Sequence, residues 1–275
     1  MNNTIPSFNN PPLNEVLLGV QYDSSEAFNL TTYGAIWDCF KEYFPDVQHH
    51  MPLEATFEKI GGRRQQFSDF PTIQLEQMTS PALPRAWFVS DDGRELIQLQ
   101  PDRFIRNWRR ADFNDEYPRY EKRLRPEFLS ALNTLNNFYK KNGFGFLKPN
   151  QCEISYINHI DADKTHCLLS DVFLGWSNQY ELSDIENINI NIKHIIKDSD
   201  SEFIGRLYIK VQPAFKLEEE KPIFLIELAI KGRPLGEGIE GVMSFMDMGR
   251  EKIVRAFAKM TTKEMHDLWD MEVNK

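Results

Sequence analysis

Alternation of apolar and polar residues constrains the fold of this chain more than any other feature. Residues 185–197 alternate isoleucine with asparagine, and residues 202–215 alternate again after a turn at residues 198–201. Residues 223–231 are almost continuously apolar, as in a strand at the centre of a sheet. A period of two over several consecutive segments predicts antiparallel strands with one buried face.

Each group of predicted strands is followed by a stretch with helical periodicity. Apolar side chains form one stripe between Pro126 and Asn142, and Gly143 provides a helix stop. A second stripe begins at Val242, and the Thr-Thr-Lys-Glu sequence of residues 261–264 predicts a capping box that restarts the helix. A shorter helix is expected over residues 29–44.

The same order of elements, β-α-β-β-β-α, can be traced twice. We expect an α+β fold with a flexible arm (residues 1–12), an N-terminal repeat (13–146) and a C-terminal repeat (147–275), each with an antiparallel sheet packed on a long helix. This order resembles TATA-binding-protein-like or helix-grip architecture, and the helix-grip form encloses an apolar cavity. The first repeat includes a strand expected at 54–60 and a surface excursion expected at 61–84.

The most unusual composition lies in residues 83–121, which are rich in Trp, Tyr, Arg, Gln and Asn. Strands at 85–90 and 95–100 flank Asp91-Asp92-Gly93, a strong hairpin signal. At Pro101 the alternation changes phase, which predicts a bulge or bend in one continuing strand. With such a bulge, one sheet face carries Gln98, Gln100, Arg103, Asn107 and Arg109.

Amide and guanidinium groups are directional donors, so this face predicts a recognition surface for an anion, a peptide or a base. The competing interpretation is a solvated face, or a buried polar network that locks the sheet to the following helix. The candidate binding residues are Gln98, Gln100, Arg103, Asn107, Trp108, Arg109, Tyr117 and Arg119.

Three motifs together carry a family resemblance. They are PPLNEVLLGVQYD (residues 11–23), LIQLQPDRFIRNWRR (96–110) followed by YPRYE (117–121), and the closing AFAKMTTKEMHDLWD (256–270). With them the chain resembles an uncharacterised, sporadically distributed family of prokaryotic proteins, through most of its length. The resemblance implies no reaction and no catalytic residues. The family's patchy occurrence suggests, by association only, a role in phage defence.

Charge and cysteine content exclude several function classes. The net charge is −9 and the pI about 5.3, which argues against non-specific binding to nucleic acid or acidic membranes. Three scattered cysteines predict neither a disulfide framework nor a zinc site. Without an apolar run long enough to span a bilayer or a signal-peptide pattern, we expect a cytoplasmic protein.

No constellation predicts a metal, a cofactor or a catalytic set. His49-His50, the Asp161/Asp163 group with His159 and His166, and the glycine-rich residues 232–238 are each explained more simply as ordinary strand, turn or loop.

The sequence therefore favours a non-enzymatic recognition or sensor protein for a protein or small-molecule partner, in phage defence or a toxin–antitoxin-like system, without deciding whether catalysis occurs. The alternative is a helix-grip protein or enzyme that binds a small ligand in an apolar cavity. Nucleic-acid binding is the weakest hypothesis, and homo-oligomerisation stays open.

Overall fold

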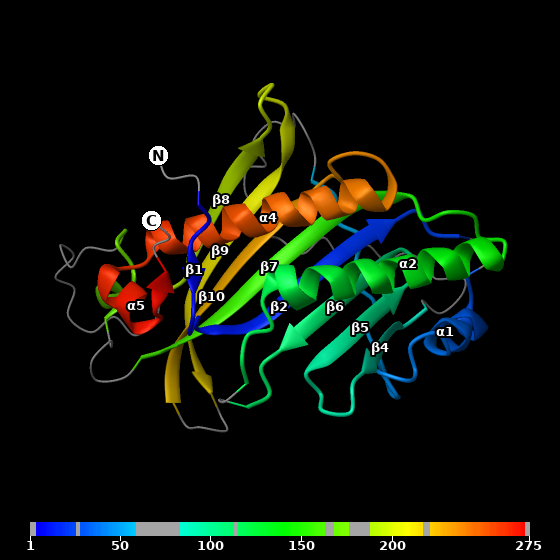
Figure 1. Ribbon diagram of the computed structural model, residues 1–275, viewed down its shortest axis with the longest axis horizontal. Helices are drawn as coiled ribbons and strands as arrows, with labels where there is room; N and C mark the ends of the chain where they lie inside the picture. Colours follow the sequence, from blue (N-terminus) through cyan, green and yellow to red (C-terminus); the bar gives the residue numbers. More distant parts are fainter. Residues whose placement is uncertain are drawn as a thin grey trace, which may run out of the picture.

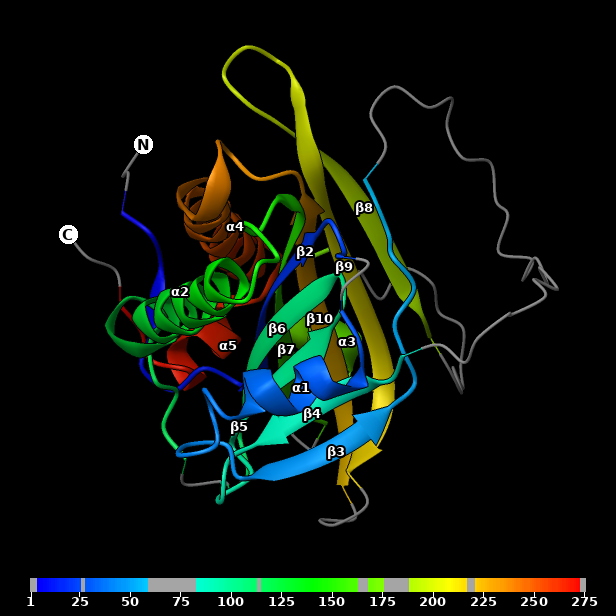
Figure 2. The same ribbon diagram turned by 90° about the vertical axis from the view of Figure 1, so that its right-hand side faces the viewer.

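The computed structural model describes residues 4–25, 28–58, 83–112, 115–162, 168–175, 188–216 and 221–272. The protein has an α+β fold in which long helices cover one side of a large antiparallel sheet (Figure 1). The long helices lie together on one side of the sheet, as the side view shows (Figure 2).

The large sheet has the strand order β3-β4-β5-β6-β2-β7-β10-β9-β8 in the described part of the chain, and every neighbouring pair is antiparallel. Strands β2 and β7 pair at its centre, so elements from both halves of the sequence form one continuous sheet. The strands are β2 (Leu13–Tyr22), β3 (Asp46–His50), β4 (Arg85–Val89), β5 (Glu95–Gln100), β6 (Arg103–Arg109), β7 (Pro149–Asp161), β8 (Ile190–Lys197), β9 (Phe203–Lys216) and β10 (Lys221–Gly232).

Two long helices, α2 and α4, pack on the sheet and on each other (Figure 1). The contact of α4 with β7 is close at Gly249, where an added Cβ would lie 2.5 Å from Ile154 Cγ2. Glycine is therefore needed for this packing distance. The helices are α1 (Leu30–Trp37), the π-helical turn η1 (Tyr120–Leu124), α2 (Arg125–Lys141), α3 (Leu169–Val172), α4 (Gly238–Met260) and α5 (Lys263–Leu268).

The two long predicted helices are confirmed, and so is the restart after the second one. Pro126 lies at the start of α2, directly after the π-helical turn η1. The capping box predicted for residues 261–264 is not the cap that forms. Thr262, not Thr261, is the N-cap of α5, and its Oγ1 accepts a hydrogen bond from the Met265 N–H. The apolar stripes of α2 and α4 face the sheet, with Phe128 and Phe245 fully buried.

The predicted bulge at Pro101 is wrong. Pro101 and Asp102 form a tight turn, and β5 and β6 are two separate strands in which Gln100 pairs with Arg103. Directly opposed residues of an antiparallel pair point to the same face. The hairpin therefore brings the predicted polar residues to one face, as the bulge would have done.

Two further expectations in the N-terminal part need correction. Residues 54–58 form no strand, and β3 at Asp46–His50 takes the edge position; the rest of that expectation, residues 59–60, lies outside the described residues, as does almost all of the excursion at 61–84. Residues 4–12 also differ from the flexible arm we expected. There β1 (Ser7–Phe8) pairs with β11 (Met271–Glu272), and Phe8 is buried against Phe257 and Trp269.

Candidate functional site

The predicted binding residues fall into three places. Four of them, Gln98, Gln100, Arg103 and Asn107, are buried on the helix-free side of the sheet, here called the polar sheet face, and Arg109 lies half-buried at its margin. Trp108 points to the opposite side, belongs to the hydrophobic core and packs against Tyr117. Tyr117 and Arg119 line a pocket on the helix side.

One part of the polar sheet face is a closed network of side chains. Gln98 Nε2 donates to Asn107 Oδ1 (2.9 Å), and Asn107 Nδ2 donates to Glu15 Oε1 (2.5 Å). Arg85 Nη1 donates to Gln98 Oε1 at 3.0 Å. Burial raises the pKa of the Glu15 carboxyl, and the hydrogen bond from Asn107 opposes this shift. These residues hold one another in place, as the structural interpretation of the face predicts.

A second part of the face binds the main chain of residues 51–58. Gln100 receives the Leu53 N–H at 2.8 Å on its Oε1 and donates to the Leu53 carbonyl at 3.1 Å. Gln21 makes the same two bonds with Thr56, at 3.2 and 2.7 Å. Arg103 Nη2 adds a bond to the Glu54 carbonyl at 2.8 Å. Each glutamine side chain thus offers one donor and one acceptor to the segment, as the main chain of an adjacent β-strand would, although the segment itself is not a strand.

The far end of this segment is held by charge. The Glu58 carboxylate contacts the guanidinium of Arg206 and the hydroxyl of Tyr208, both on β9. Burial and the nearby carboxylate raise the pKa of Tyr208, so its hydroxyl stays protonated and donates. The segment therefore crosses the sheet from β5 to β9, opposite the helices (Figure 2).

The fit between face and segment is incomplete. Arg103 Nε, Gln151 Nε2 and Ser155 Oγ are buried and have no hydrogen-bond partner among the described residues. A small cavity of about 10 Å³ adjoins Thr56 and Gly19 at this place. Buried polar groups are normally satisfied, so these three mark a part of the face that the segment leaves unused.

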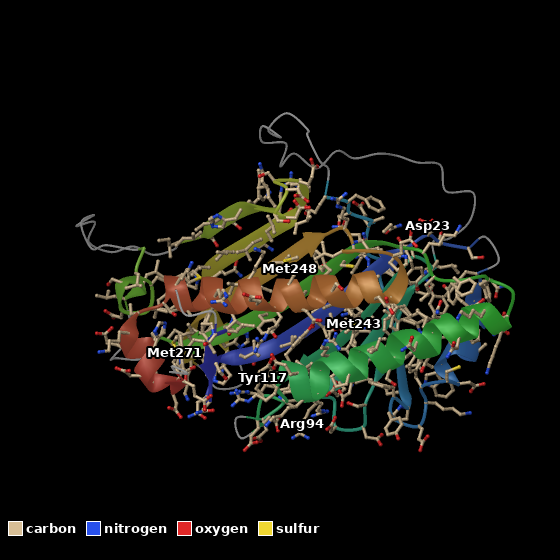
Figure 3. All side chains as sticks on the ribbon, turned by 45° about the horizontal axis from the view of Figure 1, so that its top comes forward. Asp23, Arg94, Tyr117, Met243, Met248 and Met271 are labelled. Carbon is tan, nitrogen blue, oxygen red and sulfur yellow. The ribbon has the colours of Figure 1, made fainter. Side chains whose placement is uncertain are left out.

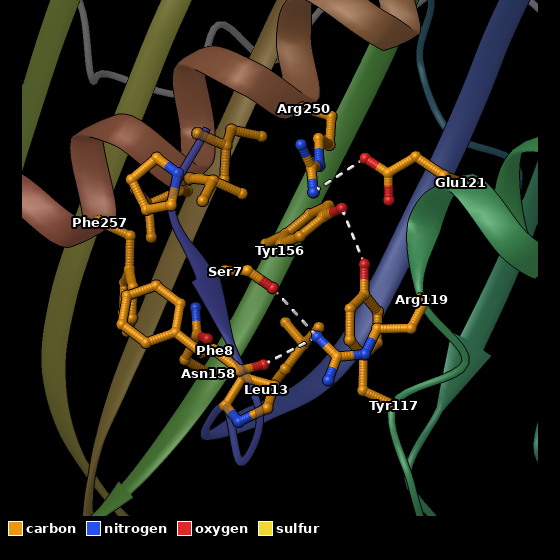
Figure 4. A pocket seen from close by; sticks show the side chains of 15 residues that line it. Ser7, Phe8, Leu13, Tyr117, Arg119, Glu121, Tyr156, Asn158, Arg250 and Phe257 are labelled. Carbon is orange, nitrogen blue, oxygen red and sulfur yellow. Dashed lines mark hydrogen bonds and ion pairs between the residues drawn. The ribbon is translucent and has the colours of Figure 1, made fainter. Parts of the chain in front are cut away.

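A larger cavity, of about 80 Å³, lies on the helix side between α4, β7 and the N-terminal strand β1 (Figure 4). We call it the arm pocket. Tyr117 lies just before the first turns of the helix (Figure 3), and its hydroxyl is 3.2 Å from that of Tyr156 on β7. Arg250 Nη2 on α4 pairs with Glu121 Oε1 at 2.9 Å at the rim.

Arg119 closes the arm pocket rather than lining its depth. Its guanidinium donates to the Phe8 carbonyl at 2.9 Å, Ser7 Oγ at 3.3 Å and Asn9 Oδ1 at 3.0 Å, and so holds β1 over the opening (Figure 4). Its backbone has φ 54° and ψ 132°, immediately before the π-helical turn. A non-glycine residue in this region and a π-helical turn are both enriched at functional sites.

Sequence reasoning missed several residues of both regions. Gln21 lies in one of the quoted motifs, and its parity in the strand places it on the side of Gln100 and Arg103, but no local pattern joins these strands. Tyr156 and Arg250 come from distant elements, and no spacing in the sequence brings them to Tyr117. The segment at 51–58 was partly predicted as a strand, and nothing in its sequence indicated the observed arrangement, because side chains from other strands make its bonds.

The other predicted clusters gain no support as sites. In the described part of the chain no group of three or more His, Cys, Asp or Glu residues is arranged to hold a metal. His50 stacks on Trp87 with ring centres 3.9 Å apart, while Asp163 and His166 lie outside the described residues. The glycine-rich residues 232–238 lead into α4. No helix among the described residues is long and apolar enough to cross a membrane.

The fold and these two regions define an α+β protein with a candidate binding region on each side of one sheet. No family model matches the chain, and no curated protein matches it. Its function is therefore inferred from the geometry of the two regions.

Proposed function

We propose that the protein is a non-enzymatic recognition protein whose polar sheet face binds an extended peptide segment of a protein partner. The observation that carries this proposal is the pair of glutamines, Gln100 and Gln21, each of which both donates to and accepts from one residue of a crossing main chain. In this arrangement the chain's own residues 51–58 occupy the surface.

The contacts between the polar sheet face and residues 51–58 indicate which kind of ligand this surface would bind. Two main-chain positions three residues apart, Leu53 and Thr56, are bound through backbone groups that every residue except proline offers. Two residues further on, Glu58 is held by a cation and a hydroxyl. The expected ligand is an extended segment with an acidic residue at this last position and few other sequence requirements.

The resident segment is held by side chains, which makes its replacement plausible on energetic grounds. Each hydrogen bond contributes only about 1 kcal/mol net to holding the segment, because water replaces it when it breaks. A competing peptide would form the same bonds again. The polar atoms of Arg103, Gln151 and Ser155 that lack a partner among the described residues could bond to a ligand, which would then bind better than the resident segment does.

The fold offers further support if the two halves are repeats of a TATA-binding-protein-like unit, as we also propose for residues 13–146 and 147–275. Outward from the central pair β2–β7, strands β6, β5 and β4 on one side correspond in order to β10, β9 and β8 on the other. Helices α2 and α4 then correspond as well. A doubled unit of this kind leaves one broad sheet face free of helices, and the polar sheet face is that surface.

A cytoplasmic location, and a role in phage defence or a toxin–antitoxin-like system, belong to the same proposal. They rest on the sequence patterns and on the family resemblance. In such a system the partner that carries the peptide segment would be encoded by a neighbouring gene, which gene neighbourhood analysis would test.

The direct test uses a fluorescently labelled peptide with the sequence of residues 51–58, MPLEATFE, and the full chain with Thr56→Pro. Proline removes the N–H that Thr56 donates to Gln21, which weakens the resident segment. Fluorescence anisotropy should show saturable binding to this variant and several-fold weaker binding to the wild type, because there the peptide must displace the resident segment. Glu58→Ala, which releases only the far end, is the second variant in case the first does not fold.

Two control peptides make the test specific. A peptide with Thr56→Pro and a peptide with Glu58→Gln should each bind more weakly than MPLEATFE, since each lacks one of the contacts seen in the structure. Equal binding of all three peptides would show that binding does not use these contacts, and no binding to a folded variant would show that the segment is a fixed part of the fold. Either result would overturn the proposal.

The alternative, a helix-grip-like protein that binds a small ligand, is favoured by one specific observation, the arm pocket between sheet and helices. The pocket is on the opposite side of the sheet from the peptide surface, so the two are separate sites.

A further inference from the structure

We propose that the arm pocket binds a small carboxylic acid, with its carboxylate at Arg250 and the Tyr117–Tyr156 hydroxyl pair and a short apolar body among the side chains below β1. This site is independent of the peptide surface on the other face of the sheet. The inference rests on the walls, the polar end and the size of the pocket.

The side chains that line the arm pocket favour a ligand with an apolar body. Most of the side chains that enclose the pocket are aliphatic or aromatic, and they come from β1, the start of β2, β10 and α4 (Figure 4). An apolar pocket with a few polar groups at one end is the usual form of a small-ligand site. The apolar residues used in this argument are Phe8, Leu13, Leu228, Ile253, Val254 and Phe257.

The polar end offers donors. One of the two tyrosine hydroxyls donates to the other across 3.2 Å, which leaves one hydroxyl proton without an acceptor among the described residues. Burial raises the pKa of Tyr117 to about 12 and also raises the pKa of Tyr156 well above its ordinary value, so both hydroxyls keep their protons at neutral pH. Beside them, Arg250 Nε is buried without a partner in the described part of the chain.

Arg250 is available to a ligand because its present partner is weakly held. The Glu121 side chain is 60 % exposed, whereas that of Arg250 is 15 % exposed. An ion pair with so exposed a partner contributes little, and the Glu121 carboxylate is readily returned to water. A ligand carboxylate would take its place at the fork of Arg250, whose planar geometry suits a carboxylate with two oxygens.

The size of the pocket sets the length of the ligand. A volume of about 80 Å³ is about half that of a cavity that accommodates benzene. Because the ligand carboxylate takes the place of Glu121 at the rim, only the apolar body has to fit this volume, which suits about three or four carbons. With β1 in place we therefore expect an acid of about five carbons or fewer, counting the carboxyl carbon. Longer acids would require release of β1 from Arg119, which holds Ser7 and Phe8.

The test is titration of the full chain with sodium pentanoate, in which binding is measured by isothermal calorimetry and by intrinsic tryptophan fluorescence. Two tryptophans report on the pocket, because Trp108 packs against Tyr117 and Trp269 stacks on Phe257. Pentanoate should bind saturably, and pentan-1-ol, which lacks the charge, at least about tenfold more weakly. Inorganic phosphate, which lacks an apolar body, should not compete.

Variants assign the binding to the pocket. Arg250→Gln should weaken pentanoate at least about tenfold and leave pentan-1-ol unchanged, because only the charged contact is lost. Lys259→Gln, which removes an equal charge from an exposed position of α4, should leave both affinities unchanged. Thr56→Pro, which acts on the peptide surface alone, should also leave pentanoate binding unchanged.

Two results would overturn the inference. One is pentanoate binding no tighter than pentan-1-ol; the other is wild-type affinity for pentanoate in Arg250→Gln. If Arg250→Gln does not fold, Tyr117→Phe provides the test of carboxylate binding, because it keeps the ring and removes one hydroxyl. It should weaken pentanoate several-fold, and an unchanged affinity there would also contradict the proposal.

Discussion

The polar sheet face and the arm pocket bury polar groups in opposite ways. On the sheet face, amide side chains are bonded to one another and to the main chain of residues 51–58, so most donors meet an acceptor within the chain. In the arm pocket, apolar walls surround two hydroxyls and Arg250, whose partner Glu121 is mostly in water.

This difference separates stability from ligand binding. A buried donor that loses its partner inside the protein carries the full cost of desolvation, whereas a cation whose partner is exposed loses little. Substitutions on the sheet face are therefore expected to act mainly on folding and on the held segment. Substitutions in the pocket are expected to act mainly on ligand affinity.

The largest effect is expected for Asn107→Ala. Asn107 is 1 % exposed and links Gln98 with Glu15, so its loss leaves the buried Gln98 Nε2 without its acceptor and the half-buried Glu15 carboxyl without this donor. We expect the free energy of unfolding to fall by about 3 kcal/mol, measured by urea denaturation. Asn191→Ala, at an exposed position of β8, is the matched control and should change it by less than about 0.5 kcal/mol.

A smaller loss is expected for Gln100→Ala. This change removes both bonds to Leu53 and should cost about 1–2 kcal/mol. It should also expose residues 51–58, so limited proteolysis within this segment should become several-fold faster while the sheet stays folded. Unchanged proteolysis would mean that the glutamine does not hold the segment.

Glu15→Gln should remove a pH dependence. Because the pKa of Glu15 is raised on folding from its ordinary value near 4.5, the folded state binds more protons in the window just above that value. Wild-type stability should therefore fall as pH rises through this window. In the variant that part of the slope should disappear, and at neutral pH its free energy of unfolding should be equal to or about 1 kcal/mol above that of the wild type. A steeper slope in the variant would contradict this assignment.

The smallest effect on stability is expected for Arg250→Gln. Because Glu121 is exposed, loss of the pair should change the free energy of unfolding by less than about 1 kcal/mol, as thermal or urea unfolding would show. Combined with a large loss of carboxylate binding, this result would sharpen the contrast with Asn107. A loss as large as that of Asn107→Ala would instead show that the pocket, too, is a structural network.

The three strands β4, β5 and β6 show which features local sequence patterns can predict and which they cannot. The Asp91-Asp92-Gly93 turn follows from the conformations those residues prefer, and the parity of Gln98, Gln100, Arg103 and Asn107 follows from alternation. The turn at Pro101 was mistaken for a bulge, because both devices change the phase of the pattern. Only the pairing of Gln100 with Arg103 distinguishes them.

The sequence by itself determined the α+β class, the two long helices and the shared face of the polar residues, because each depends on spacings of a few residues. The tertiary structure decided what lies on that face and which side chains meet in the arm pocket. Strand order and helix packing bring together residues that are far apart in the sequence. On the polar sheet face these are Gln21, Gln100 and Thr56, and in the arm pocket they are Tyr117, Tyr156 and Arg250. Such contacts leave no periodic signal, since each depends on the free energy of the whole packed chain rather than on the preference of any one segment.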